Sequence, residues 1–307
     1  MKNHRNPQYL NRLGELVELK HSIRTDGIDE VKSTLIELLK KRKVNVLGVN
    51  GGDGTLNGVL NALIELLHTK TINEDEVPLL MPLNGGTYNI ASRAMGTKGN
   101  PVATAMEFKM RYGDGIIDDI KVANLPVLEL KQSDGSCIRG MVFGSEVVSN
   151  ALDLCAGFGS GYKGLAKLLL KGVTGVMLKT DFLRENAWRF NPDHDYVVVD
   201  GQKIKAGAVI LSTIDLTLVK GLIHSIKATR GRAHFHAKVI TTQDPNQIIR
   251  ILPNLLWDLP NRKILDFSRA KEVITWGPFT IDGEIYPYQG QLLIRPSGYS
   301  FEMVTFK

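Results

Sequence analysis

The chain has 307 residues, of which 43% are hydrophobic and 23% are charged. These values are close to the average for globular proteins, so they exclude intrinsic disorder, low-complexity polymers and small disulfide scaffolds. The length allows two domains of roughly 100–200 residues each. A net charge of +6 favours anionic ligands or surfaces but carries no information about the fold.

The apolar segments and the cysteines indicate the cellular compartment. No stretch reaches the roughly 18 uninterrupted apolar residues that a spanning helix needs, and Met1–Lys20 lacks an apolar core. The two cysteines, Cys137 and Cys155, give no disulfide framework. We therefore expect a cytoplasmic protein that does not span a membrane.

The first 120 residues alternate strand and helix patterns. The spacing of apolar residues predicts a helix over Ile28–Lys41, and short apolar runs predict buried parallel strands. This alternation indicates a doubly wound α/β domain with a parallel sheet. The expected strands are Glu18–Thr25, Val44–Val49 and Val77–Pro82, and further helices are expected over Leu56–Leu67, up to Met95 and over Pro101–Arg111.

After Asp119 the pattern changes to strands separated by turn residues such as Asp200 and Gly201. Helices are fewer, with Tyr162–Leu170 and Pro245–Leu256 as the candidates. This half is predicted to be β-rich and antiparallel. We place the domains at residues 1–120 and 121–307, with the last strands able to return to the first domain. The expected strands are Val122–Leu130, Tyr196–Val199, Ala206–Ser212, Ala233–Thr241, Lys271–Ile274 and Gln291–Arg295.

The strongest motif is the turn Gly51-Gly52-Asp53-Gly54-Thr55, which lies between an apolar strand and a helix. Glycines let the backbone approach a ligand closely, and the following helix N-terminus, with Thr55 as a candidate N-cap, is suited to phosphate. An aspartate repels phosphate unless it holds a magnesium ion or a proton at the transferring group. The motif therefore favours phosphoryl chemistry, with a tight structural turn as the alternative.

A second glycine-rich turn, residues 84–89, has the sequence Asn-Gly-Gly-Thr-Tyr-Asn and follows the next predicted strand. In an open α/β sheet, turns at the carboxyl ends of neighbouring strands line one crevice, and ligands bind there. Alone, this motif is as typical of an ordinary turn as of binding. Paired with the first turn, it predicts a binding site.

Together with Asp282-Gly283-Glu284, these turns resemble, in their order, the motifs of diacylglycerol kinase-type lipid kinases, a group that includes bacterial diacylglycerol kinases and sphingosine kinases. The resemblance covers most of the chain. It implies ATP-dependent phosphorylation of a lipid hydroxyl with magnesium, with the nucleotide between the two domains. Glu284 is implied as the general base and Asp53 as a second catalytic residue. The implied cofactor-binding residues are Gly51, Gly52, Gly54, Thr55, Gly85, Gly86, Thr87 and Asn89, and the implied metal-binding residues are Asp53 and Asp118.

The residues themselves give a thinner case for Glu284. Thr280–Ile281 and Ile285–Tyr286 flank the acidic turn, a pattern equally typical of a hairpin with exposed acids. A hydroxyl nucleophile needs a positioned carboxylate that accepts its proton during phosphoryl transfer. That requirement agrees with the role that the resemblance implies.

Two other functions stay open. NAD kinase shares the first glycine turn, although the late Asp-Gly-Glu favours the lipid branch. Family members usually open with an Asn-Pro-x-Ser-Gly loop, whereas Asn6-Pro7 is followed here by Gln8-Tyr9. This departure supports a catalytically silent lipid- or nucleotide-binding protein as the second alternative.

We expect a lipid substrate at the membrane surface and peripheral contact at the inner membrane face. Leucines and lysines within Tyr162–Leu178 are typical either of an interfacial helix or of a core helix with a solvated lysine face. The acid-free stretch Leu216–Gln243 has no accompanying nucleic-acid-binding module, so nucleic acid is not expected.

Isolated histidines and cysteines are weaker signals. His234 and His236 share one face of a predicted strand, but two ligands do not make a zinc site. Cys137 and Cys155 have no activating base nearby in the sequence, so we expect buried thiols rather than nucleophiles.

Overall fold

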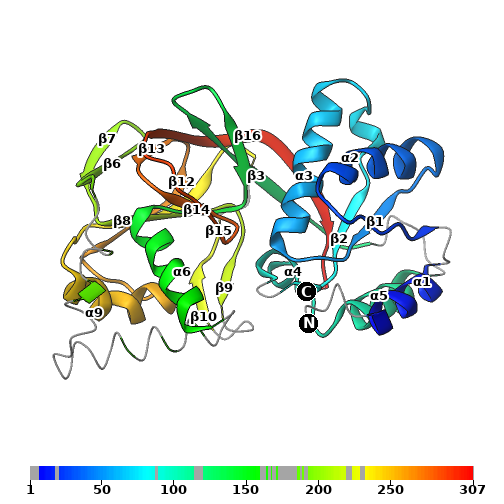
Figure 1. Ribbon diagram of the computed structural model, residues 1–307, viewed down its shortest axis with the longest axis horizontal. Helices are drawn as coiled ribbons and strands as arrows, with labels where there is room; N and C mark the ends of the chain where they lie inside the picture. The colour runs from blue at the N-terminus through cyan, green and yellow to red at the C-terminus, as the bar shows by residue number, and fades with distance from the viewer. Residues whose placement is uncertain are drawn as a thin grey trace. The chain divides into compact units, whose positions relative to one another are not determined.

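The computed structural model describes residues 7–17, 21–86, 89–113, 120–159, 164, 167, 171, 185–186, 189, 193–218, 223–228 and 232–306. The chain divides into two compact units (Figure 1). The first comprises Met1–Leu125 and Tyr299–Lys307, and the second comprises Pro126–Gly298. The observed division thus follows Leu125, slightly beyond residue 120, and the end of the chain belongs to the first unit.

The first unit contains a small parallel sheet. β1 (Val46–Val49) pairs in parallel with β2 (Leu79–Pro82), and β2 pairs in parallel with β16 (Gln291–Val304) at Met303. Met81 of β2 packs in one core cluster with Leu13 and Val102, which belong to two helices on that face. The helices of this unit are α1 (Pro7–Leu16), α2 (Asp29–Ile36), α3 (Asp53–His68), α4 (Ile90–Ala94) and α5 (Pro101–Tyr112), with a π-helical turn at Glu37–Lys41 and a 3-10 turn at Glu74–Glu76.

Most elements predicted for this unit are confirmed, with small differences at their ends. The strand expected over Glu18–Thr25 is wrong in its described part, because residues 21–25 form no strand. In the described part of the sheet, β1 is the edge strand and pairs only with β2, so residues 21–25 do not add a strand to its free edge. Helix α1, which the sequence pattern did not predict, precedes this segment and packs against α5.

In the described residues of the second unit, strands of two sheets surround a common core, and Leu216–Leu218 and Ile223–Ile226 form a separate two-stranded sheet. A six-stranded sheet has the order β12-β11-β8-β5-β14-β15, and the neighbouring strands of the other sheet are β16-β13-β6-β7, with β3 paired to β4. Phe143, Phe235 and Phe279 of the six-stranded sheet are completely buried in this core. The strands are β3 (Val122–Gln132), β4 (Cys137–Gly140), β5 (Val142–Gly144), β6 (Tyr196–Val199), β7 (Gln202–Lys205), β8 (Ala208–Ser212), β9 (Leu216–Leu218), β10 (Ile223–Ile226), β11 (Phe235–Ile240), β12 (Ile264–Ala270), β13 (Val273–Trp276), β14 (Phe279–Ile281), β15 (Glu284–Tyr286) and β16 (Gln291–Val304).

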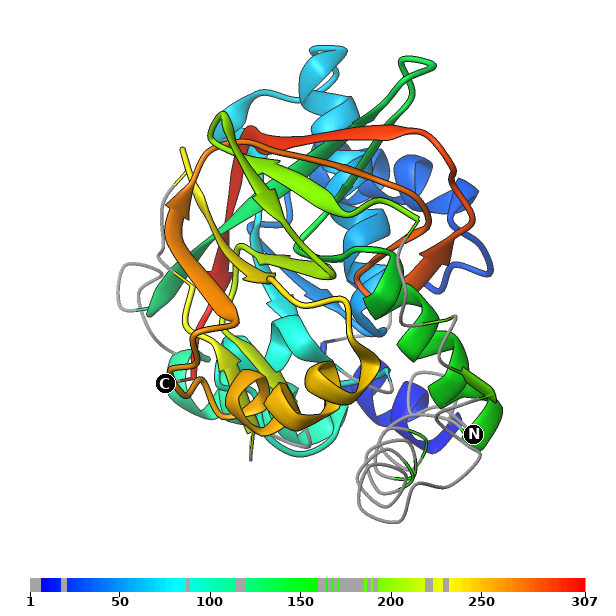
Figure 2. The ribbon, with the colours of Figure 1, turned by 90° about the vertical axis from the view of Figure 1, so that its left-hand side faces the viewer.

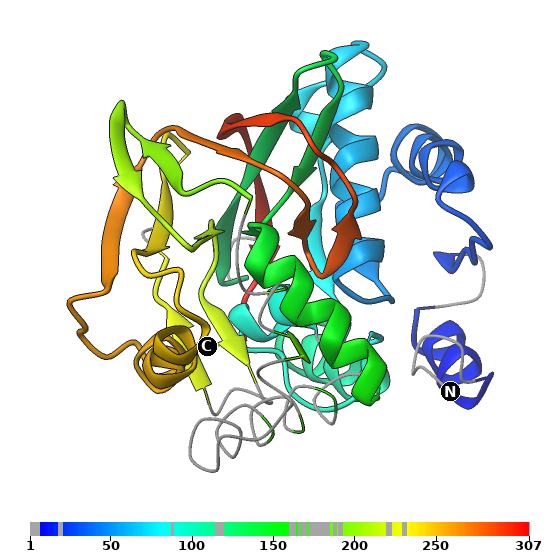
Figure 3. The ribbon, with the colours of Figure 1, turned by 60° about the vertical axis from the view of Figure 1, so that its left-hand side comes forward.

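Two helices pack on the outer face of the six-stranded sheet (Figure 3). Helix α9 (Pro245–Leu256) has the predicted bounds, whereas α6 (Glu146–Phe158) was not predicted. Their apolar residues, among them Val147 and Ile251, pack with Ala208 and Ile240 of the sheet. Most of the helix expected over Tyr162–Leu170 lies outside the described residues.

Two strands run from one unit into the other. Most of β3 belongs to the second unit and its first residues belong to the first, and β16, drawn in red in Figure 2, divides at Tyr299. Within the second unit β16 pairs antiparallel with β13. The α/β unit followed by a β-rich antiparallel unit is the fold class that the sequence predicts. None of the described helices combines the length and apolar character needed to cross a bilayer.

Candidate active site

The two glycine-rich turns of the first unit touch each other. The first follows β1 and the second follows β2, so both lie at the carboxyl ends of parallel strands. A Cβ atom added at Gly86 would lie 2.2 Å from the Cα atom of Gly52, so only glycine allows this approach. The absence of a side chain at Gly86 therefore serves the contact between the two turns.

Helix α3 begins at the first turn without a side-chain cap. Its N-cap residue is Gly52, which makes no side-chain hydrogen bond, so the expectation that Thr55 caps the helix is wrong. Thr55 lies inside the first helical turn, and its side chain packs over Gly51, where an added Cβ would lie 2.3 Å from the Thr55 Cβ. An uncapped helix start of this kind offers main-chain amides to an anion.

Asp53 links the first turn to α4. Its side chain is buried, and Oδ1 accepts a hydrogen bond of 3.0 Å from the main-chain amide of Ala91. Burial raises the pKa of this carboxyl above its ordinary value, while hydrogen bonds from the amides of Ala91 and Ile90 and the charge of Arg93 act in the opposite direction. Asp53 thus holds α3 and α4 together, although burial disfavours the charged form of its carboxyl group.

Asn89 closes the second turn. It adopts a left-handed conformation (φ +52°), which asparagine tolerates better than most residues. Its Oδ1 accepts from the amide of Gly86 at 2.8 Å, and its Nδ2 donates to the Gly86 carbonyl at 3.0 Å. The Asn89 side chain is therefore occupied by the turn itself. Thr87 lies outside the described residues.

Three polar residues around these turns were not singled out as site residues from the sequence. Asn84 and Ser92 are buried, and the Ser92 hydroxyl donates to the Asn84 side-chain oxygen at 2.5 Å. The side-chain oxygen of Asn50 is buried, and no donor in the described part of the chain reaches it. An unsatisfied acceptor beside an uncapped helix start fits a ligand that carries hydroxyl or amino groups as well as phosphate.

The described residues do not form a magnesium site by themselves. No group of three or more histidine, cysteine, aspartate or glutamate residues comes together among them. Asp53 is the acidic residue of the first turn, and Asp118 lies outside the described residues. Magnesium is usually bound through one or two carboxylates together with substrate phosphates, and a single, already bonded carboxylate is a partial match to that set.

In the second unit, Asp282-Gly283-Glu284 forms a hairpin turn between β14 and β15. Asp282 and Gly283 both have positive φ values, +51° and +87°, as a two-residue hairpin turn requires. Asp282 is buried and not exposed: its carboxylate accepts from the amides of Met141 and Val142 at 3.0 and 2.9 Å. The hairpin is therefore fixed to the chain between β4 and β5.

Glu284 is exposed on this anchored hairpin. The Tyr286 hydroxyl lies 3.4 Å from Oε2 of Glu284, a long hydrogen bond. Burial and the neighbouring Glu284 raise the pKa of Tyr286, so the phenol stays protonated and can donate to this carboxylate. The sequence allowed two interpretations of this turn, a plain hairpin or the site of a general base. The two are compatible, because Asp282 anchors the turn and Glu284 is exposed to solvent.

The weaker candidates have structural surroundings. His236 is buried, with Nδ1 at 2.9 Å from the Lys227 carbonyl and Nε2 at 2.7 Å from an Asp266 oxygen. Cys155 is buried as expected, and burial raises its pKa to about 11. Cys137 is exposed, so the expectation of a buried thiol is wrong there, because Cys137 begins the short strand β4 at the surface.

Comparison with known proteins gives one family and one fold. Residues 3–120 match the family model described as the diacylglycerol kinase catalytic domain. No curated protein sequence matches the chain.

Three solved structures from Bacillus anthracis str. Sterne share the fold. Two are of proteins with a provisional diacylglycerol kinase assignment, at 17% and 18% identity with TM-scores of 0.62 and 0.60. The third is described as a diacylglycerol kinase, at 16% identity with a TM-score of 0.59. Each alignment covers 97% of this chain, and 92%, 91% and 90% of the respective other chain.

Proposed function

Residues 3–120 belong to the diacylglycerol kinase catalytic-domain family, in a divergent form, and on that premise we propose that the chain is a lipid kinase. It transfers the γ-phosphoryl group of ATP to the hydroxyl of a diacylglycerol-like or sphingoid lipid. The observation that carries the proposal is the contact between Gly52 and Gly86 beside the uncapped start of α3. This geometry supports phosphate binding, and the family supports the kinase reaction.

The nucleotide binds at the glycine turns of the first unit. Main-chain amides of the first turn of α3 donate to the phosphates, and the helix dipole favours their negative charge. The buried side-chain oxygen of Asn50 accepts from a hydroxyl or amino group of the nucleotide. Asp53 acts as a positioning residue, because its hydrogen bond to the Ala91 amide holds α4 against the first turn.

Glu284 removes the proton from the attacking hydroxyl. The lipid oxygen forms a bond to the γ-phosphorus while the bond from that phosphorus to the β–γ bridging oxygen breaks, and ADP leaves with the electron pair. The proton moves from the hydroxyl to a carboxylate oxygen of Glu284 and then to solvent. Exposure of Glu284 on an anchored hairpin supports this role, since the carboxylate is accessible and its main chain is fixed.

The proposal is tested by transfer of labelled phosphate from ATP, in a magnesium-containing buffer, to a panel of neutral lipids in mixed micelles. NAD is included as a soluble acceptor, because an NAD kinase would label it. Glu284→Gln is expected to lower kcat by roughly 10²–10⁴. Glu302→Gln is the matched control, since Glu302 is also exposed on a strand, and its turnover is expected to equal that of the parent.

Each outcome has a distinct meaning. Labelling of one lipid that is lost in Glu284→Gln and kept in Glu302→Gln supports the reaction and names the substrate. Labelling of NAD alone contradicts the lipid substrate. ATP binding without transfer to any acceptor contradicts the kinase reaction and leaves a nucleotide-binding protein.

A further inference from the structure

The loop between α9 and β12, residues 257–263, exposes two large apolar side chains. Trp257 and Leu259 are each 52% exposed, and they flank Asp258 in the sequence. Isolated apolar side chains are common at protein surfaces. Two such side chains within three residues are unusual, and specific contacts must keep them exposed to water.

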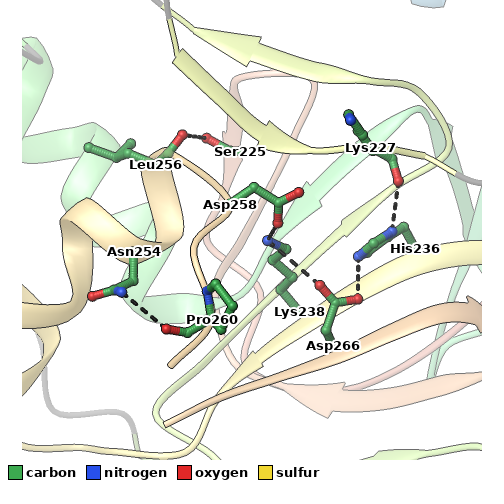
Figure 4. A network of polar contacts seen from close by, with 9 residues as sticks. All are labelled: Ser225, Lys227, His236, Lys238, Asn254, Leu256, Asp258, Pro260 and Asp266. Atoms are coloured by element: carbon green, nitrogen blue, oxygen red, sulfur yellow. Dashed lines mark hydrogen bonds and ion pairs between the residues drawn. The ribbon is translucent and has the colours of Figure 1, made fainter. Parts of the chain in front are cut away.

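Hydrogen bonds fix this loop in its exposed position (Figure 4). The last turn of α9 is held by Ser225, whose hydroxyl donates to the Leu256 carbonyl at 3.3 Å. The Leu259 amide donates to the Asn254 carbonyl at 2.8 Å, and the Asn254 side chain donates to the Pro260 carbonyl at 3.3 Å. The chain therefore cannot turn Trp257 and Leu259 inward without breaking several main-chain contacts.

The acid of the loop is turned toward the protein. Asp258 pairs with the ammonium group of Lys238, which is almost fully buried beneath it (Figure 4). A second acid, Asp266 of β12, lies 3.7 Å from the same ammonium group and 2.7 Å from Nε2 of His236. The buried ammonium group of Lys238 thus compensates the Asp258 carboxylate and lies near that of Asp266.

The basic residues of the loop stay available. Arg262 and Lys263 are both exposed, and no carboxylate within the described ranges pairs with either. The loop therefore presents an indole, an isobutyl group and two cations, while the charge of its one acid, Asp258, is compensated by the buried Lys238. Tryptophan at the headgroup level, leucine in the acyl boundary and cations on anionic lipids are the features of an interfacial anchor.

We propose that the α9–β12 loop docks the second unit onto an anionic lipid bilayer, with Trp257 and Leu259 inserted at the interface and Arg262 and Lys263 on the headgroups. The biological role of this docking rests on the proposed function, because a lipid kinase takes its substrate from a membrane. Its physical basis is independent of turnover, since docking needs only the loop and the bilayer.

Cosedimentation of the full chain with vesicles, in the absence of ATP, tests the docking. We expect binding to phosphatidylglycerol-containing vesicles that weakens as salt is added, because exposed charges are screened. Trp257→Ala combined with Leu259→Ser should lower the partition coefficient by about tenfold or more. Arg262→Glu combined with Lys263→Glu should lower it by about tenfold or more on anionic vesicles and leave weak binding to neutral vesicles unchanged.

Matched controls carry the same changes elsewhere. Met110→Ser removes a side chain that is 77% exposed on α5, and Lys205→Glu combined with Lys271→Glu reverses two exposed charges of the second unit. Both controls should bind vesicles within about twofold of the parent, and thermal unfolding of all variants should match. Equal binding by the parent and both loop variants overturns the proposal. So does a parent that ignores vesicles and instead self-associates through this loop in sedimentation velocity.

Activity measurements separate this proposal from the kinase proposal. If the protein is a kinase, the loop variants should keep turnover on mixed micelles of short-chain lipid and lose it on vesicles. If no lipid is phosphorylated but vesicle binding still maps to the loop, the docking stands and the kinase reaction fails. Full activity on vesicles with unchanged binding in both loop variants rejects the docking alone.

Discussion

Asp53 and Asp282 are both buried aspartates in glycine-containing turns, and both accept hydrogen bonds from main-chain amides of distant segments. They differ in what they hold. Asp282 satisfies the adjacent amides of Met141 and Val142 and so anchors the hairpin that presents Glu284. Asp53 lies in the first turn of an uncapped helix, where burial raises its pKa. Asp282 therefore stabilises its surroundings, while Asp53 is held at some cost in stability beside the proposed nucleotide site.

The largest expected effect separates Asp282 from its neighbour. Asp282→Ala leaves the buried amide of Met141 and the half-buried amide of Val142 without this acceptor and places alanine at φ +51°, so we expect a loss of about 3 kcal/mol in the free energy of unfolding. Glu284→Ala, at an exposed position of the same hairpin, should change it by less than about 0.5 kcal/mol. Urea unfolding measures both, and equal losses would remove the distinction between anchor and base.

Contact between the glycine turns gives the next effect. Gly86→Ala places a methyl group 2.2 Å from the Gly52 main chain, so the turns must separate. We expect a loss of about 1–3 kcal/mol in stability, together with weaker ATP binding in calorimetry. Gly27→Ala is the control, because nothing lies within 4 Å of a Cβ added there. Unchanged ATP affinity in Gly86→Ala would show that the turns need not touch to bind nucleotide.

Asp53→Asn tests whether burial of the Asp53 carboxylate costs stability. Because burial raises the folded-state pKa of Asp53, its stabilising effect is full below the ordinary value of 3.8 and is lost as the pH rises through the raised value. Asparagine keeps an acceptor for the Ala91 amide without this loss. We expect the variant to be at least as stable as the parent at about pH 7, with a flatter dependence of Tm on pH and weaker phosphoryl transfer. Glu146, whose pKa burial also raises, contributes the same slope to both proteins. A variant less stable than the parent at neutral pH contradicts this account.

The smallest effect concerns the two thiols. Cys155 is buried with a pKa of about 11, so it should not react with a thiol reagent in the native protein near pH 8. Cys137 is exposed and should react, although partial desolvation of its thiol and the nearby Glu129 raise its pKa and slow the reaction. One reactive thiol is expected before unfolding in guanidinium and two after it, and two in the native state would place Cys155 at the surface.

Local patterns predicted the elements whose signals are local. The run Val44–Val49, the turn at Gly51–Thr55 and the helix Pro245–Leu256 carry their own apolar spacing and turn residues, and the structure has a strand, a turn and a helix there. Helix α6 was not predicted because Val147 and Val148 favour strands locally. Its apolar face is stabilised by packing on the six-stranded sheet, which the local sequence does not reveal. Tertiary packing decided the outcome at that position.

The motifs predict candidate site residues, but they do not predict the hydrogen bonds that these residues make. The motifs contain Asp53, Asn89 and Asp282. The amide that Asp53 accepts from lies 38 positions away in the chain. The two amides that Asp282 accepts from lie 141 and 140 positions away. Spacing within a motif cannot reveal such partners. The signal that could have identified Asp282 as an anchor is its place in a two-residue hairpin, where its side chain turns back toward the preceding strands.

The return of the chain end to the first unit has a consequence for biosynthesis. Val304 and Phe306 complete a core cluster that otherwise comes from the first 120 residues, and Met303 supplies the partner of β2. The residues of the first unit up to Leu125 precede those of the second unit, yet its parallel sheet gains a third strand only from β16. Residues 1–125 therefore cannot complete this core cluster until translation has passed through the whole second unit.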